Sequence, residues 1–208
     1  MENTENGFMS LGLSEKTLIA LEKKGFKEPS EIQRLCIPLL LEENTEVIGQ
    51  AQTGTGKTAA FGLPIIEKIE GGQHEVEALV LCPTRELAIQ VSEEINSLKG
   101  DRDIEIIPIY GGASMENQLK RLRKGVDVVV GTPGRVLDHI RRKTLKLDGL
   151  KFDVFDEAHI EHLICFIEDS KLESFKLECL TSDVVENSSW SSYNYINTLP
   201  ESLELILH

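Results

Sequence analysis

The sequence lacks long hydrophobic runs. The longest strongly apolar segments among its 208 residues are residues 35–41 and 127–131, whereas a membrane-spanning helix needs about 20 apolar residues in succession. The first residues of the chain contain neither a basic region nor an apolar core, so we expect no secretory signal. The sequence therefore predicts a cytoplasmic protein that has no membrane partner.

Cysteines with metal-binding or disulfide-framework spacing are also missing. The four cysteines are Cys36, Cys82, Cys165 and Cys179, and none of them forms a Cys-x-x-Cys pair with another. Closely spaced pairs are what zinc sites and small disulfide scaffolds require. We expect reduced thiols, and neither a zinc site nor a disulfide framework.

Positive charge is scarce. The formal net charge is −13, which disfavours a nucleic-acid partner because phosphate binding needs cations that replace counterions. The charge is uneven: residues 1–159 hold 20 Lys+Arg and 26 Asp+Glu, whereas residues 160–208 hold two lysines, nine acids, and no glycine or arginine. We predict a boundary there, with one domain in residues 1–159 and an atypical, acidic, partly disordered segment in residues 160–208.

Short β-branched runs alternate with amphipathic helical patterns as far as residue 157. The expected strands are residues 46–50, 77–82, 104–110, 126–132 and 152–157. The expected helices are residues 14–24, 30–41, 58–70, 85–99, 115–123 and 136–142. Such alternation predicts an α/β fold in which a parallel sheet carries helices on both faces. Beyond the boundary, we expect helices over residues 160–175 and 199–208.

The strongest chemical signal is a glycine-rich segment that follows an expected strand and opens an expected helix, the context of a phosphate-binding loop. Its glycines let backbone N–H groups turn toward a β-phosphate, Lys57 reaches the β- and γ-phosphates, and the Thr58 hydroxyl ligates Mg²⁺. A glycine-rich turn with a chance lysine is the alternative. The nucleotide-contacting residues expected in this segment are Gln52, Thr53, Gly54, Thr55, Gly56, Lys57 and Thr58.

An acidic pair stands at the end of the last expected strand before the boundary. Asp156 and Glu157 close the apolar run that begins at Phe152. In this position Asp156 suits a second magnesium contact, through water, and Glu157 suits polarisation of an attacking water. We expect both to act in catalysis together with Lys57. A solvated acidic pair that caps a strand is the alternative.

These segments together resemble the first RecA-like domain of the DEAD-box family of ATP-dependent RNA helicases, over about residues 8–159. Residues 25–33, which include Phe26 and Gln33, look like the Q motif of that family, and Phe8 looks like its isolated upstream aromatic. The resemblance implies a RecA-like P-loop fold with ATP and Mg²⁺ as cofactors. It also implies that Gln33 reads the adenine edge and that Phe8 stacks on the base, with Phe26 in the same site.

Three further segments are similar to the RNA-contacting motifs of the family, namely motif Ia (residues 83–88), the GG element (residues 111–112) and motif Ib (residues 132–135). The resemblance implies that they hold the sugar-phosphate backbone of RNA, independently of base sequence, through main-chain N–H groups, hydroxyls and arginines. Helix N-termini and glycine amides supply such donors, so the net acidity does not exclude RNA. The residues concerned are Pro83, Thr84, Arg85, Gly111, Gly112, Thr132, Pro133, Gly134 and Arg135.

The acidic pair and the next two residues, 156–159, look like motif II of the family, and the sequence departs from the family at the end of this motif and beyond. His159 stands where the family has Asp, either as a tolerated polar exchange or as a change in the link to motif III. The Ser-Ala-Thr of motif III is absent after residue 159, and there is no room for the second RecA-like domain. That domain supplies an arginine finger in the family, and such fingers are worth roughly 10³–10⁵ in rate.

The departures leave alternatives open. Residues 160–208 are a degenerate or frame-shifted end, a genuine alternative ending, or a partner-binding element. The chain is an RNA helicase ATPase in a truncated, monomeric form, an ATP- and RNA-binding module without turnover, or an inactive fragment. A second RecA-like domain supplied in trans would complete the enzyme. In the inactive fragment, the sheet lacks the strand that carries motif III in the family, and we expect it to expose a strand edge or a helix face.

Overall fold

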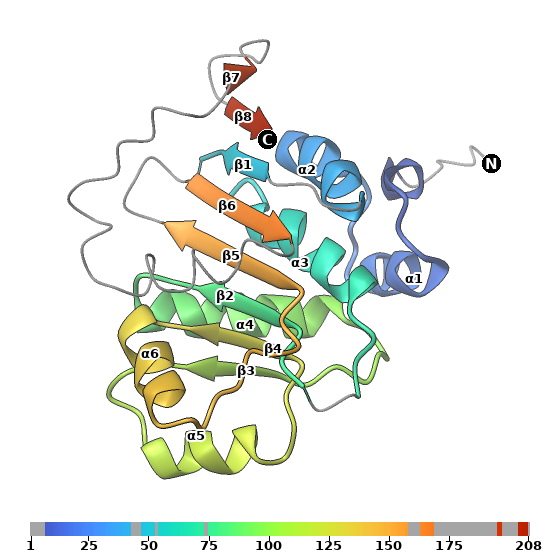
Figure 1. Cartoon of the computed structure of the whole chain (residues 1–208). Helices are drawn as coiled ribbons and strands as arrows, with labels where there is room; N and C mark the ends of the chain where they lie inside the picture. Colours follow the sequence, from blue (N-terminus) through green and yellow to red (C-terminus); the bar gives the residue numbers. More distant parts are fainter. Residues whose placement is uncertain are drawn as a thin grey trace.

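The computed structural model describes residues 7–42, 47–52, 54–72, 75–157, 163–168, 195–196 and 204–207. Within these residues the chain forms one sheet with the strand order β3-β4-β2-β5-β6-β1-β8-β7 (Figure 1). The strands are β1 (Val47–Gln50), β2 (Ala78–Leu81), β3 (Ile106–Ile109), β4 (Val128–Gly131), β5 (Phe152–Glu157), β6 (Leu163–Glu168), β7 (Tyr195–Ile196) and β8 (Glu204–Leu207). Among the helices of the described residues, none has both the length and the hydrophobicity of a membrane span.

The strands that precede the expected motifs all run in one direction. Strands β3, β4, β2 and β5 pair in parallel. Strand β6 is antiparallel to both β5 and β1, so β1 also runs in the direction of β5. The carboxyl ends of β1 to β5 therefore meet at the same edge of the sheet. Pro108 lies in β3, an edge strand, where a residue without an N–H group is tolerated.

Each strand and α-helix up to residue 157 forms where the sequence predicts it, to within three residues, whereas the short helix η1 was not predicted. The α-helices start after strands or after Ser and Thr residues that flank them, as N-terminal capping requires. The helical elements are η1 (Gly7–Leu11), α1 (Glu15–Lys23), α2 (Glu31–Leu41), α3 (Lys57–Lys68), α4 (Arg85–Leu98), α5 (Met115–Leu122) and α6 (Pro133–Arg141). Helix α6 begins three residues earlier than expected, because Pro133 occupies its first turn, where the fixed φ of proline suits a helix.

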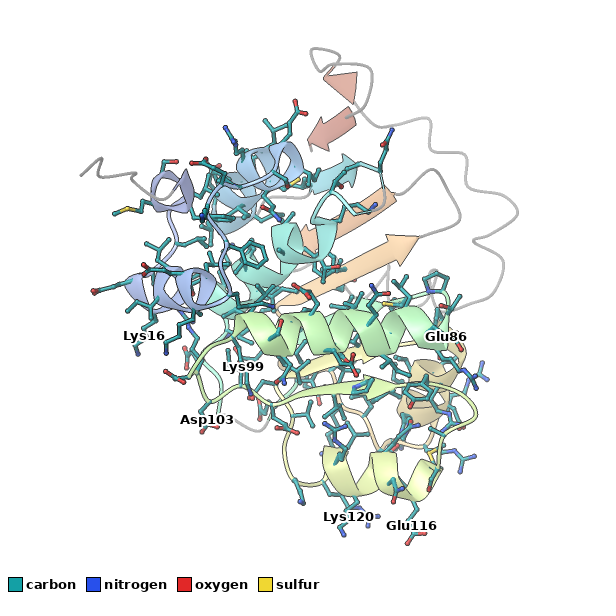
Figure 2. All side chains as sticks on the ribbon, turned by 180° about the vertical axis from the view of Figure 1, so that it is seen from behind. Lys16, Glu86, Lys99, Asp103, Glu116 and Lys120 are labelled. Atoms are coloured by element: carbon teal, nitrogen blue, oxygen red, sulfur yellow. The ribbon has the colours of Figure 1, made fainter. Side chains whose placement is uncertain are left out.

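Helices cover both faces of the parallel strands, which confirms the predicted architecture. Side chains alternate along β2, so Ala78 and Val80 join the core beneath α1 to α4, whereas Leu79 and Leu81 join a second core with Val136 of α6. Figure 2, viewed from behind, shows α4 crossing one face of the sheet. The chain thus builds a three-layer α/β structure with a core on each side of the sheet.

Residues beyond the boundary form strands rather than the expected helices. Residues 163–168 form β6, which pairs with β5 on one side and with β1 on the other. Residues 204–207 form β8, which pairs with β1. Short apolar runs have no period that separates a buried strand from a helix, which is why the helix prediction was wrong there. Among the described residues, β6 therefore covers the edge of β5 that faces away from β2.

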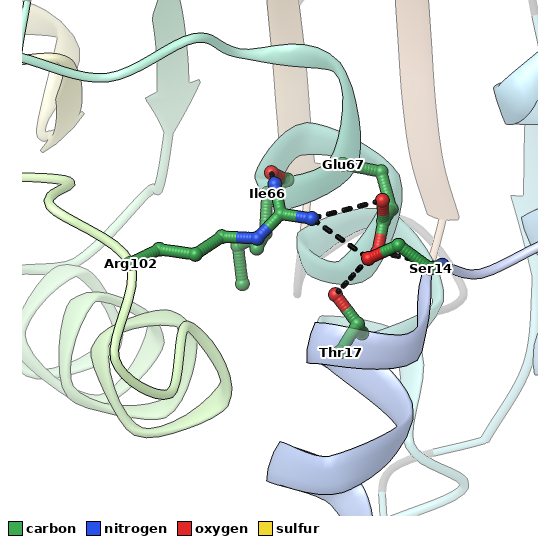
Figure 3. A network of polar contacts seen from close by, with 5 residues as sticks. All are labelled: Ser14, Thr17, Ile66, Glu67 and Arg102. Carbon is green, nitrogen blue, oxygen red and sulfur yellow. Dashed lines mark hydrogen bonds and ion pairs between the residues drawn. The ribbon is translucent and has the colours of Figure 1, made fainter.

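A partly buried ion-pair network joins the start of α1 to α3 (Figure 3). The guanidinium of Arg102 donates to Glu67 Oε2 (3.0 Å), to Ser14 Oγ (2.9 Å) and to the carbonyl of Ile66. Ser14 in turn donates to Glu67 Oε1 from both its N–H and its hydroxyl. Because Glu67 lies near the end of α3, the network sets the axis of the helix whose first turn carries Lys57.

Candidate functional site

The expected site residues meet at the carboxyl edge of the sheet. The glycine-rich loop follows β1, the acidic pair ends β5, and the three RNA-type motifs follow β2, β3 and β4. In Figure 2, Glu86 and Glu116, which lie in the first turns of α4 and α5, point toward the same side of the view. Ligands of open α/β sheets bind at this edge, where loops and helix N-termini converge. The fold therefore assembles these segments into one surface.

The glycine-rich loop adopts a conformation that only its glycines allow. Gly54 and Gly56 have φ values of +79° and +86°, in the region that side chains with a Cβ avoid. Thr55 Oγ1 donates to the carbonyl of Gln52 (2.7 Å), which tightens the turn. Gly56 is the N-cap of α3, so the N-terminus of that helix opens directly onto the loop.

Lys57 folds back across the same loop. Its Nζ donates to the carbonyl oxygens of Ala51 (2.5 Å) and Gln52 (3.1 Å). Phosphate oxygens are charged and therefore accept more strongly than carbonyls, so a bound phosphate competes for this ammonium group. Thr58 is half-buried in the first turn of α3, and Thr53 lies outside the described residues.

The side chain of Gln33 is hydrogen-bonded to the glycine-rich loop. Its Oε1 accepts from the N–H of Ser30 (3.0 Å), and its Nε2 donates to the carbonyl of Gly56 (3.0 Å). The side chain is 3% exposed. A Cβ on Gly56 would lie 2.3 Å from Gln33 Nε2. A side-chain amide has two N–H groups and two lone pairs, so Gln33 keeps one of each for a second partner.

The two aromatic residues expected at the nucleotide differ in exposure. Phe8 is 0% exposed and packs edge-on against Phe26, with ring centroids 6.0 Å apart at 74°. As the structure places it, Phe8 offers no face to a base. Phe26 is half-buried, which makes it the aromatic of this pair with accessible surface.

The acidic pair occupies the last two positions of β5. Asp156 pairs in register with Ile164 of β6, and Glu157 pairs with Leu163. Only β6 separates β5 from β1, so the backbone of the pair lies about 10 Å across the sheet from the strand that leads into the loop. Ala158 and His159 lie outside the described residues.

The three RNA-type motifs contact one another. Nη1 of Arg85 lies 3.7 Å from the position that a Cβ on Gly112 would take. Nη1 of Arg135 donates to the carbonyl of Ala113 (3.4 Å), and the N–H of Thr132 donates to the carbonyl of Ile109. Motif Ia, the GG element and motif Ib thus form one continuous surface of backbone donors and arginines.

Two helix N-termini and an exposed arginine give this surface its electrostatic character. Thr84 caps α4 by accepting from the N–H of Leu87 (3.2 Å), and Thr132 precedes the first turn of α6. Arg85 and Glu86 form an exposed ion pair (2.5 Å). The hydrogen bond between them raises the pKa of Arg85 and lowers the pKa of Glu86. A phosphate at this surface competes with Glu86 for Arg85.

The sequence reasoning missed a buried polar pair behind this surface. Gln118 and His139 are hydrogen-bonded to each other, and Gln118 also donates to the carbonyl of Tyr110. A single histidine on the apolar face of a helix is usually a core residue, so the sequence carries no signal for the pair. Only the fold brings α5, α6 and the loop after β3 together.

Comparison with known proteins places these motifs in a family. The family model described as DEAD/DEAH box helicase matches residues 30–166. The chain belongs to this family. The match begins within the Q-motif-like segment and spans the phosphate loop, the RNA-type motifs, the acidic pair and the start of β6.

Curated members of the family are similar over most of the chain. It is 52% identical over 162 residues to the DEAD-box ATP-dependent RNA helicase CshA of Geobacillus kaustophilus, covering 78% of this chain and 34% of that protein. It is 51% identical to the ATP-dependent RNA helicase CshA of Listeria monocytogenes, covering 31% of that protein. The chain thus spans about a third of the length of these relatives.

Solved structures of family members share the fold. A DEAD box protein from the hyperthermophile Methanococcus jannaschii matches with a TM-score of 0.68 and 42% identity, over 86% of this chain and 45% of that one. Dbp5 of S. cerevisiae, in a structure bound to RNA and ADP BeF3, matches with a TM-score of 0.64 and 35% identity, over 74% of this chain and 39% of that one. The RecA-like architecture is therefore common to this chain and these helicases.

Proposed function

We propose that this chain is the ATP- and RNA-binding core of an ATP-dependent RNA helicase and that it hydrolyses ATP at the carboxyl edge of its sheet. The observation that carries the proposal is the convergence of the phosphate loop, the acidic pair and three RNA-type motifs at that edge. The family assignment and the names of the relatives support the same chemistry.

The nucleotide half of the proposed site is built around α3. The N-terminus of α3 and the amides of residues 54–57 receive the phosphates, while Lys57 exchanges its carbonyl partners for phosphate oxygens. Gln33 presents its remaining donor and acceptor to the adenine, and Phe26 offers the ring face. This arrangement selects ATP, since an amide pairs with the donor and acceptor at the adenine edge.

The donor set also fits magnesium. Mg²⁺ prefers hard oxygen ligands and keeps several waters, and the Thr58 hydroxyl lies in the turn that follows Lys57, at the edge where Asp156 ends β5. We propose Thr58 as a direct ligand and Asp156 as a ligand through water. A magnesium ion held by these two residues would supply positive charge to offset that of the nucleotide phosphates. Glu157 orients the attacking water and accepts its proton.

The RNA-binding half of the proposed site contacts the sugar-phosphate backbone of RNA. Its donors are the N-termini of α4 and α6, the amides of Gly111 and Gly112, and the side chains of Arg85 and Arg135. Because these groups face sugars and phosphates rather than base edges, binding is independent of sequence. We further propose that the chain is a monomer and that a second RecA-like domain is supplied in trans. We also propose a cytoplasmic location, because the buried thiols of Cys36 and Cys82 suit a reducing compartment.

The proposal is tested by ATP binding and by RNA-stimulated phosphate release from the purified chain. Wild type is compared with Lys57→Ala and with Lys16→Ala, which removes an exposed lysine of α1. We expect Lys57→Ala to abolish both signals and Lys16→Ala to match wild type. If wild type releases phosphate no faster than Lys57→Ala, the proposed hydrolysis is wrong for this chain.

A binding module without turnover is the second candidate. It is favoured by β6, an antiparallel strand that follows the acidic pair in a sequence without a motif III. ATP binding without phosphate release identifies this function. An inactive fragment is recognised by a thermal melt that Mg·ATP does not shift, since a ligand that binds the folded state must raise its stability.

A further inference from the structure

We infer that His139 and Gln118 are positioning residues: they form a buried hydrogen-bond relay that holds the loop of residues 110–113 against α6 and so sets the spacing between the GG element and motif Ib. This loop is called the GG loop below. The inference rests on the proposed RNA-binding function, and it names the internal support of that site.

The relay is continuous from α6 to the GG loop. His139 Nε2 lies 3.1 Å from Gln118 Oε1, and Gln118 Nε2 donates to the carbonyl of Tyr110 (3.0 Å). On the other side of the ring, His139 Nδ1 lies 2.9 Å from Thr144 Oγ1. His139 is 0% exposed and Gln118 is 6% exposed. Buried polar groups of this kind are retained only when they are hydrogen-bonded, and here both are.

The Tyr110 carbonyl at the end of the relay determines which atoms of Gln118 and His139 donate and which accept. The Tyr110 carbonyl can only accept, so the NH₂ group of Gln118 must face it and Oε1 must face His139. His139 therefore donates from Nε2. The Thr144 hydroxyl lies within hydrogen-bond distance of two acceptors, Nδ1 of the neutral His139 ring (2.9 Å) and the His139 carbonyl (3.0 Å), and its single proton serves one of them at a time. Burial and the neighbouring Arg135 lower the pKa of His139, which favours this neutral form.

The relay has a second tie beside it. Nη1 of Arg135 donates to the carbonyl of Ala113 (3.4 Å). The carbonyls of Tyr110 and Ala113 flank Gly111 and Gly112, so the two ties hold the glycine pair from both sides. Gly112 has a φ of +83°, and nothing lies within 4 Å of a Cβ built on Gly111. Glycine has wide backbone freedom, so these two ties restrict the conformation of the pair.

A purely structural role is the competing explanation. A core residue that only fills space contributes to global stability, and its loss weakens all ligands alike. A positioning residue has a local effect: its loss loosens the GG loop and weakens RNA binding, while the phosphate loop, which follows β1, keeps its affinity for ATP. A structural role therefore predicts that loss of His139 weakens ATP and RNA binding alike. A positioning role predicts weaker RNA binding and faster exchange of the GG-loop amides alone.

The test compares three variants. His139→Leu removes the donor to Gln118. His139→Gln places an amide N–H where Nε2–H stood and is the conservative rescue. Leu122→Ala trims a partly buried side chain of α5 in the same core and is the packing control. Two quantities are measured in each folded variant: the hydrogen exchange of the amides of residues 110–113 and 54–57, and the dissociation constants for Mg·ATP and for a single-stranded oligouridine.

We expect His139→Leu to exchange the GG-loop amides about tenfold faster and to bind the oligouridine about tenfold more weakly, as the loss of one net hydrogen bond implies. The amides of residues 54–57 and the ATP affinity stay at wild-type values. His139→Gln recovers most of both losses, and Leu122→Ala shows neither.

Three results would overturn the relay. The first is a folded His139→Leu whose GG-loop amides exchange as in wild type. The second is equal loss of ATP and oligouridine affinity in His139→Leu and in Leu122→Ala. The third is an NMR spectrum of wild type in which the neutral His139 ring carries its proton on Nδ1. If wild type binds ATP but no oligouridine, the proposed RNA function fails, and the exchange and NMR measurements decide the relay by themselves.

Discussion

At the scale of single residues, two glycines of the phosphate loop form a matched pair. Gly54 and Gly56 share a positive φ, but nothing lies within 4 Å of a Cβ on Gly54, whereas a Cβ on Gly56 would meet Gln33 Nε2 at 2.3 Å. An alanine therefore introduces similar backbone strain at both positions, but its Cβ collides with the Gln33 side chain only at position 56.

We expect Gly54→Ala to lower the free energy of unfolding by about 1–2 kcal/mol, the usual cost of a left-handed alanine, and Gly56→Ala to lower it further. Gly56→Ala also displaces the Gln33 amide and weakens ATP binding. Urea unfolding and ATP titration of both variants measure the difference. Equal losses in the two variants would show that the contact between Gln33 and Gly56 contributes nothing.

His139 gives the stability of the fold a pH dependence. Its pKa is lowered below 6.5 by burial first and then by Arg135 and Arg142, while Asp138 opposes the shift. The unfolded chain therefore binds a proton at a higher pH than the folded one. The stabilising contribution of neutral His139 is complete above about pH 6.5 and is lost as the pH falls through the folded pKa.

We expect wild type to lose more unfolding free energy between about pH 7.5 and about pH 5 than His139→Gln, whose amide does not titrate. Denaturant unfolding at both pH values measures the two changes. The carboxylates titrate in both proteins, so their contribution cancels in the comparison. An identical pH dependence in the two proteins would contradict the shifted pKa.

At the scale of elements, the network around Arg102 joins helix α1 to α3. The side chains of Arg102 and Glu67 are 19% and 11% exposed, whereas the exposed ion pair of Lys23 with Asp101 is 66% and 96% exposed. A buried carboxylate that loses its partner keeps an uncompensated charge, and such losses cost about 3–5 kcal/mol. An exposed pair contributes about 0–1 kcal/mol.

We therefore expect Arg102→Met to lower the free energy of unfolding by about 3 kcal/mol and Lys23→Met by less than about 1 kcal/mol. Urea unfolding of the two variants gives both numbers. Adding Glu67→Leu to Arg102→Met should recover part of the loss, since it removes the unpaired carboxylate. A double variant that is less stable than Arg102→Met alone would contradict this account.

The elements also show how far the sequence leads. Strands and helices before residue 157 are predictable because buried strands are short continuous apolar runs, whereas amphipathic helices repeat their apolar residues every three to four positions. Gly54 and Gly56 mark the phosphate loop by their backbone preferences, and Pro133 marks the start of α6. Strand β6 escapes prediction because a short apolar run has no distinguishing period. Phe8 is predictable as a family position but not as a fully buried residue, and the pairing of Gln118 with His139 depends on contacts across the fold.

At the scale of the whole molecule, the net charge of −13 shapes how RNA binds. The proposed RNA surface contains only two cations, Arg85 and Arg135, and its other donors are neutral amides and hydroxyls. Neutral donors release no counterions. Affinity for RNA should therefore depend weakly on salt, because the slope against salt reports the number of phosphates that are neutralised.

For single-stranded RNA we expect a slope of log K against log salt of about −1 to −2, from roughly 0.7 per neutralised phosphate. Titration of a fluorescent oligouridine at several salt concentrations measures it, and Arg135→Gln should flatten it by about 0.7. A slope near −5 would require about seven phosphate contacts and would contradict a surface built from amides.

The pairing of β1 has a consequence for the order in which the protein is made. Among the described strands, β1 pairs only with β6 and β8, so residue 48 meets residues 165 and 206. Domains fold as they leave the ribosome from the N-terminus, and contacts between distant residues form slowly. Strands β2 to β5 can therefore assemble while β1 still waits for its neighbours. On a nascent chain, the proposed RNA surface, which follows β2, β3 and β4, can therefore form before residues 204–207 emerge and pair with β1.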